Sequence, residues 1–407
     1  MPHRPPSLPH LGGITAVILF AIVLAAFVVE SELAQYVQTT LEFRQPFFIF
    51  YVVHSSFAIS FPLHVLYLRT ATKYTLSGLL SGLKLSITDH LTPKGVQPYT
   101  GTSFPYRKFI TLVLTLTLGM TLPGLLWFAA VSLAPLSDVT AIWNTNPFFA
   151  YILTVKLYGL HWESRRLVGV VLATAGVMVV VYGGMKTEDG SGVTARSPRP
   201  SRALVGDVLT LLAALVQGLY QVMYKRYAAL PNDPELQEDE DYERLSEEDP
   251  DARSETSRII PVPDDDIVHP PPFGLHPTLL TSLVGLATGT VLWIAFPILD
   301  YLDMEPFRLP PNTRVAFGIA GIALSGVVFN SGFMILLGVW GPVIASVGSL
   351  LTIVLVVISD ALWGAGLEAL TFWSICGSTI IVAAFGMLAY DVYQKSYAPS
   401  TTSHVHD

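Results

Sequence analysis

Ten stretches of mostly apolar residues, each about 17–25 residues long, recur along this chain of 407 residues. A stretch of that length crosses the hydrocarbon core of a bilayer as an α-helix, because each residue adds about 1.5 Å of rise. The sequence therefore predicts an all-α integral membrane protein with ten transmembrane helices. We expect the spans at residues 12–30, 46–68, 109–133, 136–157, 165–183, 203–225, 277–298, 314–338, 341–362 and 370–391.

The charged residues are few and unevenly placed. They make up 13% of the chain, against about 25% in a soluble globular protein. From Asp233 to Asp266 there are fifteen Asp and Glu residues but only three Arg residues. Such a segment buries too little apolar surface to offset its ordering entropy. We therefore predict an acidic, disordered cytosolic loop at residues 231–272 and a cytosolic tail at residues 393–407.

The orientation follows from the basic residues, which favour cytosolic loops. With a cytosolic N-terminus, sixteen of the 23 Lys and Arg residues lie on the cytosolic side. Both termini are thus expected in the cytosol, in a multi-pass protein of an endomembrane (Golgi, endoplasmic reticulum or vacuole). The stretch Ile14–Val29 lacks a clear cleavage site and is followed by Glu30 and Glu32, so we interpret it as the first span rather than a signal peptide.

An internal repeat organises the apolar stretches. Residues 126–184 and 329–387 share one layout, with an apolar span, a short link containing a proline, a span with scattered polar residues, a brief loop and a glycine-bearing span. The predicted second repeat covers residues 203–392, and residues 1–230 hold the first repeat together with the start of the second. Because each repeat has five spans, the two copies must have opposite orientations, which is typical of secondary transporters.

The two central segments of these repeats resemble a known family. LSDVTAIWNTNPFFAYILTVKLYGLHWESRRLVGVVLATAGVMVVVYGG (136–184) is similar to the fourth and fifth spans of the drug/metabolite transporter superfamily (EamA-like). GPVIASVGSLLTIVLVVISDALWG (341–364) resembles its ninth span. Within that superfamily the chain looks most like solute-carrier family 35, subfamily F. The resemblance implies ten spans and the transport of an organic solute, such as a nucleotide sugar or thiamine.

Polar side chains inside a span are costly unless they are paired or face water, so each is a candidate for substrate binding. Pro147 should also free the backbone carbonyl of Trp143 one turn earlier. Packing and hydrogen bonding between helices remain the alternative role for each candidate. The candidates are Thr140, Asn144, Asn146 and Tyr151 in the fourth span, Gln217 and Tyr220 (with Gln221 and Tyr224 on the same face) in the sixth, His54 in the second, Asn330 (with Ser331) in the eighth and Ser349 in the ninth.

The placement of the basic residues favours a neutral or cationic solute, such as a thiamine-like compound. No Lys or Arg lies in the middle of any span, whereas a buried diphosphate needs fixed positive charge. A nucleotide-sugar transporter, or a scaffold or receptor that uses the acidic loop, remains the alternative. We expect no enzyme activity, no cofactor, no metal and no nucleic-acid partner. The expected partners are the bilayer, a small-molecule substrate and a second copy of the chain. Gly285 and Gly289 form a GxxxG motif, which lets helix backbones approach closely either within the bundle or across such a dimer.

Overall fold

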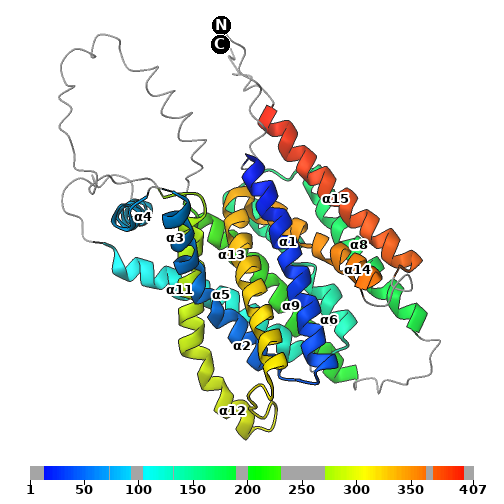
Figure 1. Ribbon diagram of the computed structural model, residues 1–407. Coiled ribbons are helices and arrows are strands. Elements are labelled where there is room, and N and C mark those ends of the chain that lie inside the picture. Colours follow the sequence, from blue (N-terminus) through cyan, green and yellow to red (C-terminus); the bar gives the residue numbers. More distant parts are fainter. Residues whose placement is uncertain are drawn as a thin grey trace, which may run out of the picture.

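The computed structural model describes residues 13–72, 74–92, 104–131, 133–188, 200–230, 271–363 and 370–397. Within these ranges the chain is helical and contains no β-strand, and its helices form a bundle (Figure 1). The main helices are α1 (Gly13–Gln35), α2 (Pro46–Ser56), α3 (Ser60–Ala71), α4 (Leu76–Leu91), α5 (Tyr106–Val131), α6 (Leu136–Trp143), α7 (Asn146–Tyr158), α8 (Ser164–Glu188), α9 (Pro200–Met223), α11 (Leu275–Val291), α12 (Ala295–Tyr301), α13 (Thr313–Ser349), α14 (Leu351–Trp363) and α15 (Phe372–Tyr397).

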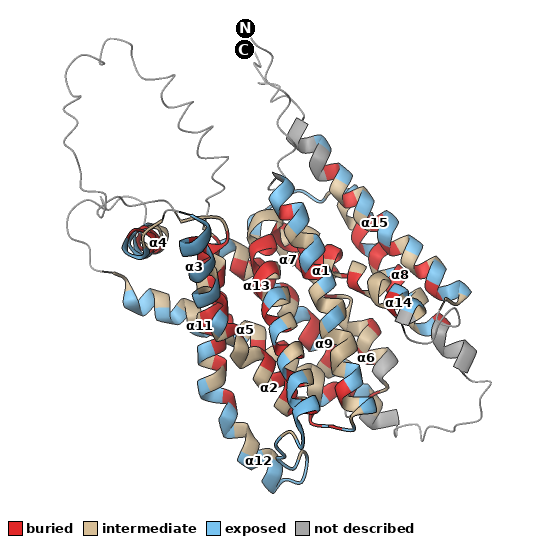
Figure 2. Ribbon diagram, in the orientation of Figure 1, coloured by how far each residue is buried: buried red, intermediate tan, exposed pale blue. Residues whose placement is uncertain are grey.

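The outer surface of the bundle is apolar, which confirms the prediction of an all-α integral membrane protein. Eight helical stretches among the described residues are long and apolar enough to cross a membrane. Their large apolar side chains point outward, for example Ile14 and Ile18 on α1 and Leu204 and Val208 on α9. In Figure 2 the buried residues gather inside the bundle and the exposed ones lie at its edges. A surface of this kind suits lipid rather than water.

The two predicted spans at residues 136–157 and 341–362 are not continuous helices. The first is divided into α6 and α7. The second continues from the predicted eighth span within α13, bends at Gly341 (φ 79°), and breaks again at Leu350 before α14. The half-helices have matching lengths, because α6 and Pro342–Ser349 are equally long and α7 and α14 each have 13 residues.

The predicted second and seventh spans bend in the same way. A 3-10 turn joins α2 to α3 at Phe57–Ile59, and another joins α11 to α12 at Leu292–Ile294. In each case a proline is the third residue of the following helix, such as Pro62 in α3. Proline has no N–H, so Pro62 leaves the carbonyl of Ala58 without its helical donor. The Ser282 hydroxyl of α11 donates to that carbonyl.

The first span is longer than predicted. Helix α1 does not end at residue 30 but runs to Gln35 and continues as a π-helical turn at Tyr36–Thr40. Glu30, the last residue of the predicted span, and Glu32, which was expected after it, therefore both lie inside the helix. Helix α9 ends in a similar five-residue π-helical turn, Tyr224–Ala228.

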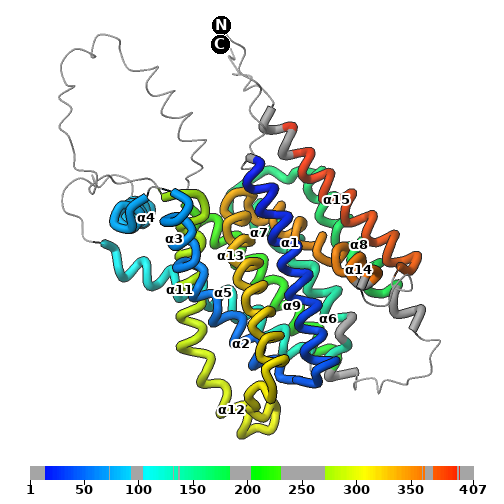
Figure 3. Tube along the Cα trace, in the orientation of Figure 1, coloured from blue at the N-terminus to red at the C-terminus, as the bar shows by residue number. Residues whose placement is uncertain are grey.

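The helices pair in a regular way (Figure 3). Helix α1 packs along α13, α5 along α9, α8 along α15 and α2 against α11, while α7 contacts both α9 and α13. Glycines allow the closest approaches, and Gly285 of α11 lies against the backbone of Phe57 and Ala58. Gly289 faces Ser55 of the same neighbouring span. The GxxxG motif is thus used within the chain, and the homodimer stays a prediction.

Helix α4 lies beside α3 and the start of α11 (Figure 1). Its Leu79 and Leu83 are buried in a cluster with Leu68 and Leu275. The acidic loop predicted at residues 231–272 lies outside the described residues except for its last two positions. The tail predicted at 393–407 is described only to Tyr397, where α15 ends.

Candidate functional site

The break in the fourth span forms around an asparagine side chain. Pro147 has no backbone N–H, so it cannot donate to the carbonyl of Trp143, as the sequence predicts. That carbonyl is not left free, because Nδ2 of Asn146 donates to it at 3.1 Å. The oxygen of the same amide group is unpaired, since Oδ1 of Asn146 is buried and accepts no hydrogen bond from the described residues.

The break in the ninth span has a similar local structure. The Thr352 hydroxyl, just after the break, donates to the carbonyl of Ser349 at 2.6 Å. It thus satisfies the carbonyl three residues earlier, as Asn146 does in the fourth span. The two broken helices meet, because α7 packs on α13 through an apolar cluster that includes Val155, Val343 and Val347.

Buried polar groups lie on α7, α9 and α13, three helices that contact one another. Like Oδ1 of Asn146, Oε1 of Gln221 and the Ser331 hydroxyl are buried and have no hydrogen-bond partner in the part of the chain that the structure describes. Gly218, one turn before Gln221 on α9, lies against the backbone of Asn146. The Tyr220 hydroxyl donates to Sδ of Met334 on α13 at 2.9 Å. We call Asn146, Tyr220, Gln221, Ser331 and Met334 the polar layer.

An unpaired buried acceptor costs about 1–3 kcal/mol, so several of them on helices that contact one another need an explanation. A ligand that donates hydrogen bonds would supply the missing partners. Of the predicted candidates, the structure brings Asn146 and Tyr220 into the polar layer. Gln221 and Ser331, which the sequence identified only as neighbours of candidates, belong to it as well.

Several other candidates bond to their own helices. Nδ2 of Asn144 donates to the carbonyl of Thr140 at 2.7 Å, and both side chains are half-buried near the end of α6. Nδ2 of Asn330 donates to the carbonyl of Gly326 at 2.9 Å. On α2, the His54 ring is hydrogen-bonded to the carbonyl of Phe50 through Nδ1.

The remaining candidates lie at different places. Gln217 is half-buried on α9, one turn before Gln221. Ser349 lines an apolar pocket and donates to the carbonyl of Ser346 at 2.7 Å. Tyr151 is buried, but its hydroxyl points to the loop after α7, where it donates to the carbonyl of Glu163 at 3.1 Å and accepts from the Glu163 N–H at 3.0 Å.

These two bonds give Tyr151 a structural role that can be measured. The substitution Tyr151→Phe removes the hydroxyl and leaves the N–H and carbonyl of Glu163 without that partner, which should lower the free energy of unfolding by about 1–3 kcal/mol. Transport at saturating substrate should change less than about twofold. Thermal unfolding in detergent and uptake by proteoliposomes check the two expectations. A large loss of transport with unchanged stability would place the phenol in the binding site instead.

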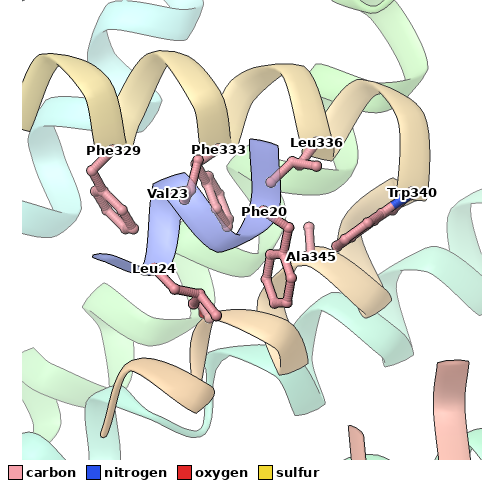
Figure 4. Close-up of a pocket in the computed structure, with 9 residues that line it drawn as sticks. Phe20, Val23, Leu24, Phe329, Phe333, Leu336, Trp340 and Ala345 are labelled. Carbon is pink, nitrogen blue, oxygen red and sulfur yellow. The ribbon is translucent and has the colours of Figure 1, made fainter. Parts of the chain in front are cut away.

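An aromatic pocket lies between α1 and α13 (Figure 4). Its free space is small, about 10 Å³, which is room for about one water molecule. Phe20 packs edge to face on Trp340, with ring centroids 4.9 Å apart. On the other side Phe329 and Phe333 are stacked. The pocket lining is Phe20, Val23, Leu24, Phe329, Phe333, Leu336, Trp340, Ala345 and Ser349.

The sequence-based prediction missed Glu30, which lies on the same helix pair. Its carboxyl group packs against Gly326 of α13, and its Oε2 is buried without a hydrogen-bond partner among the described residues. The residue was placed at the very end of the predicted first span, 12–30, because the apolar run ends at Val29. Good helix formers continue to Gln35, however, and that continuation was the signal that Glu30 belongs to the helix.

Two curated relatives and a solved structure are among the proteins that resemble this chain. The thiamine-repressible mitochondrial transport protein THI74 of Saccharomyces cerevisiae is 23% identical over 382 residues, covering 91% of this chain and 90% of the relative. The uncharacterized transporter C405.03c of Schizosaccharomyces pombe is 24% identical over 384 residues, covering 92% and 95%. A solved chain described only as "Crystal structure of protein" has a TM-score of 0.53 at 13% identity, covering 94% of this chain and 98% of that chain. No family model matches the chain.

These similarities extend over nearly the whole chain. The solved structure shows a shared fold and, at 13% identity, nothing more. Both relatives are named as transporters, and neither is named as an enzyme. Together with the apolar helices, they support the class of membrane transporters for this protein.

Proposed function

We propose that this protein is a secondary transporter that moves a small organic solute by alternating access between two five-helix bundles. The observation that carries the proposal is the meeting of two broken helices beside the polar layer. Irregular backbone at membrane depth is tolerated only inside protein or beside a cavity, and transporters use it to bind substrates. The unpaired acceptors of Asn146, Gln221 and Ser331 are suited to a solute with hydrogen-bond donors.

The internal symmetry supports the two-bundle mechanism. If each span is matched to the one five places later, the pairing of α1 with α13 corresponds to that of α9 with α5. The pairs α2 with α11 and α8 with α15 then correspond to themselves. The π-helical ends of α1 and α9, the 3-10 turns of the second and seventh spans and the breaks of the fourth and ninth spans also match. Inverted repeats of this kind rock about a site between them.

The solute class that we favour is neutral or cationic. The basic residues at the end of α9 are already engaged, since Lys225 donates to the carbonyl of Gly338 and Arg226 to that of Leu157. These carbonyls lie near helix C-termini, where positive charge is favourable. The resemblance to solute-carrier family 35, subfamily F, points to a thiamine-like compound among other solutes. The Saccharomyces relative is named for repression by thiamine, and its name states no cargo.

A nucleotide-sugar transporter and a non-transporting scaffold or receptor that recruits partners through the acidic loop are the alternatives. Deleting residues 232–268 separates the scaffold from the carrier, because a carrier should still move its solute without the loop.

The location of the protein in the cell is a related proposal. The sequence favours an endomembrane, whereas the Saccharomyces relative is named as mitochondrial, and a fluorescently tagged full chain distinguishes the two.

The proposed function is tested with purified protein and a metabolite panel of thiamine and its phosphates, nucleosides, nucleotide sugars, amino acids and polyamines. A ligand that binds only the native state raises the melting temperature, by an amount that corresponds to about 2.7 kcal/mol at a hundred times its dissociation constant. We expect a dose-dependent shift with one chemical class and uptake of that class by proteoliposomes. Uptake no greater than in protein-free vesicles for the whole panel would contradict the transporter assignment.

A further inference from the structure

Glu30 lies deep inside the membrane-spanning part of the bundle. Helices α1 and α13 run antiparallel, since Val37 faces Gly318 and Val23 faces Gly332. Between these contacts the Glu30 carboxyl group packs against Gly326, which is about halfway along the predicted eighth span, while Glu30 lies five residues before the end of α1. A carboxylate at such a depth is expensive and is usually functional.

No basic side chain of the described residues forms an ion pair with Glu30. Lys225, which contacts the same helix α13, reaches it at Gly338, twelve residues and about 18 Å of helix rise from Gly326. A carboxyl group in a medium of low dielectric constant is either neutral or paired with a cation. The protein therefore supplies a buried negative charge, or a proton in its place, and no countercharge of its own.

Glu30 and the polar layer meet the same stripe of α13, at positions eight residues or about 12 Å of helix rise apart. Gly326, Asn330, Met334 and Gly338 are four residues apart and form one stripe along α13. Glu30 contacts the first of these residues, and the Tyr220 hydroxyl bonds to Met334. Because glycine has no side chain, Gly326 lets the Glu30 carboxyl group and Val53 pack closely against α13. The helices α1 and α9, which correspond to each other in the proposed repeat, thus meet the same stripe of α13.

The aromatic pocket lies along the same two helices. Phe27, one turn before Glu30, packs on Phe329 with ring centroids 5.0 Å apart, and Phe329 lines the pocket. Phe333 and Trp340 continue the aromatic lining away from the carboxyl group. Aromatic faces attract organic cations through their quadrupoles, and tryptophan does so most strongly. Aromatic rings next to an unpaired carboxylate are the combination that recognises a positively charged organic ligand.

We propose that Glu30 is a substrate-binding residue that selects organic monocations, with the positive group beside its carboxylate and the apolar part towards Phe329 and the aromatic pocket. The inference rests on the proposed transport function and deepens it by assigning the charge of the solute. Of the neutral and the cationic solute, the inference thus selects the cationic one. The polar layer supplies hydrogen bonds to the remainder of the cation.

The experiment compares the full-length wild type with Glu30→Gln, which keeps the shape of the side chain and removes its charge. The matched control is Glu32→Gln, two residues along the same helix and on its other side. Oε1 of Glu32 is also buried without a hydrogen-bond partner among the described residues, so this control tests whether the position of Glu30, and not carboxylate burial alone, selects cations. Thermal shifts are recorded with the cations thiamine, 1-methylnicotinamide and tetraphenylphosphonium, with neutral nicotinamide and with anionic nicotinate. A carbodiimide, which attacks protonated carboxyl groups in apolar surroundings, labels Glu30 with and without each cation, and mass spectrometry measures the labelling.

We expect at least one cation to raise the melting temperature and to slow the labelling of Glu30. Glu30→Gln should weaken its binding by about tenfold or more, since a buried charge pair loses one partner, while Glu32→Gln binds as the wild type does. Equal cation binding by wild type and Glu30→Gln, or labelling of Glu30 that no cation slows, would overturn the inference. If uptake of a neutral or anionic solute then survives in Glu30→Gln, transport stands and only the cation assignment falls. Absence of uptake of every solute by the wild type removes the transport function itself.

Discussion

The substitution Gly285→Ala is expected to lower the free energy of unfolding by more than about 3 kcal/mol, the upper end of the usual cost of overpacking. A Cβ atom at this position would lie 2.3 Å from the backbone nitrogen of Ala58 and 2.7 Å from the carbonyl carbon of Phe57. Backbone atoms cannot turn aside as a flexible side chain can. Helix α11 would have to move away from the bend between α2 and α3, with loss of the bond from Ser282 to Ala58. Thermal or denaturant unfolding in detergent measures the effect.

Alanine substitutions at two other glycines serve as comparisons for Gly285→Ala. At Gly289 an added Cβ would meet only the side chain of Ser55, at 3.3 Å, so Gly289→Ala should cost less than Gly285→Ala. At Gly386 on α15 nothing lies within 4 Å, and Gly386→Ala should be neutral or should stabilise by up to about 1 kcal/mol through helix propensity. Equal stability of all three variants would mean that α11 does not pack on the second span as the structure has it.

The sequence predicted the fold class because hydrophobic length is a local property. Each lipid-crossing helix needs its own apolar run, and a window along the chain detects it without knowledge of any contact. The sequence also indicated short links at Pro135 and Pro342, because proline limits the backbone wherever it occurs. At Pro342 the structure has a kink within α13 instead of a link. The prediction that Pro147 removes a donor from the carbonyl of Trp143 was right about the backbone. It did not include the neighbouring side chain, Asn146, which takes over as the donor.

The candidate site could be predicted only in part, because it depends on which helix faces meet. Tyr151 and Asn146 lie close together in the sequence, yet one bonds to the loop at Glu163 and the other faces α9. Helical spacing places residues on a face without saying which neighbour covers it. Glu30 was missed for a different reason. The end of an apolar run was taken as the end of the helix, although a single carboxyl group is tolerated in a span when it faces the bundle interior.

The substitution Asn146→Leu is expected to reduce transport by at least about tenfold while the protein still folds. Two stability effects oppose each other: the carbonyl of Trp143 loses its donor, and the buried, unpaired Oδ1 is removed. Each effect is about 1–3 kcal/mol, so the net change in the free energy of unfolding should remain within about 2 kcal/mol. The acceptor that a substrate would use disappears, and leucine cannot replace it. Uptake by proteoliposomes and thermal unfolding of the same preparation measure the two quantities.

The control for this substitution is Asn144→Leu, two residues away at the same break. The Nδ2 of Asn144 donates to the carbonyl of Thr140 within its own helix, and the side chain is only half-buried. This variant should lose less transport than Asn146→Leu. If the order is reversed, the binding face of the fourth span is that of Asn144 and Thr140, and the polar layer is a packing feature. An equal loss of transport in both variants, with equal destabilisation, would assign the effect to the broken helix as a whole. Unpaired buried acceptors define a binding site only if their removal lowers transport and leaves the stability unchanged.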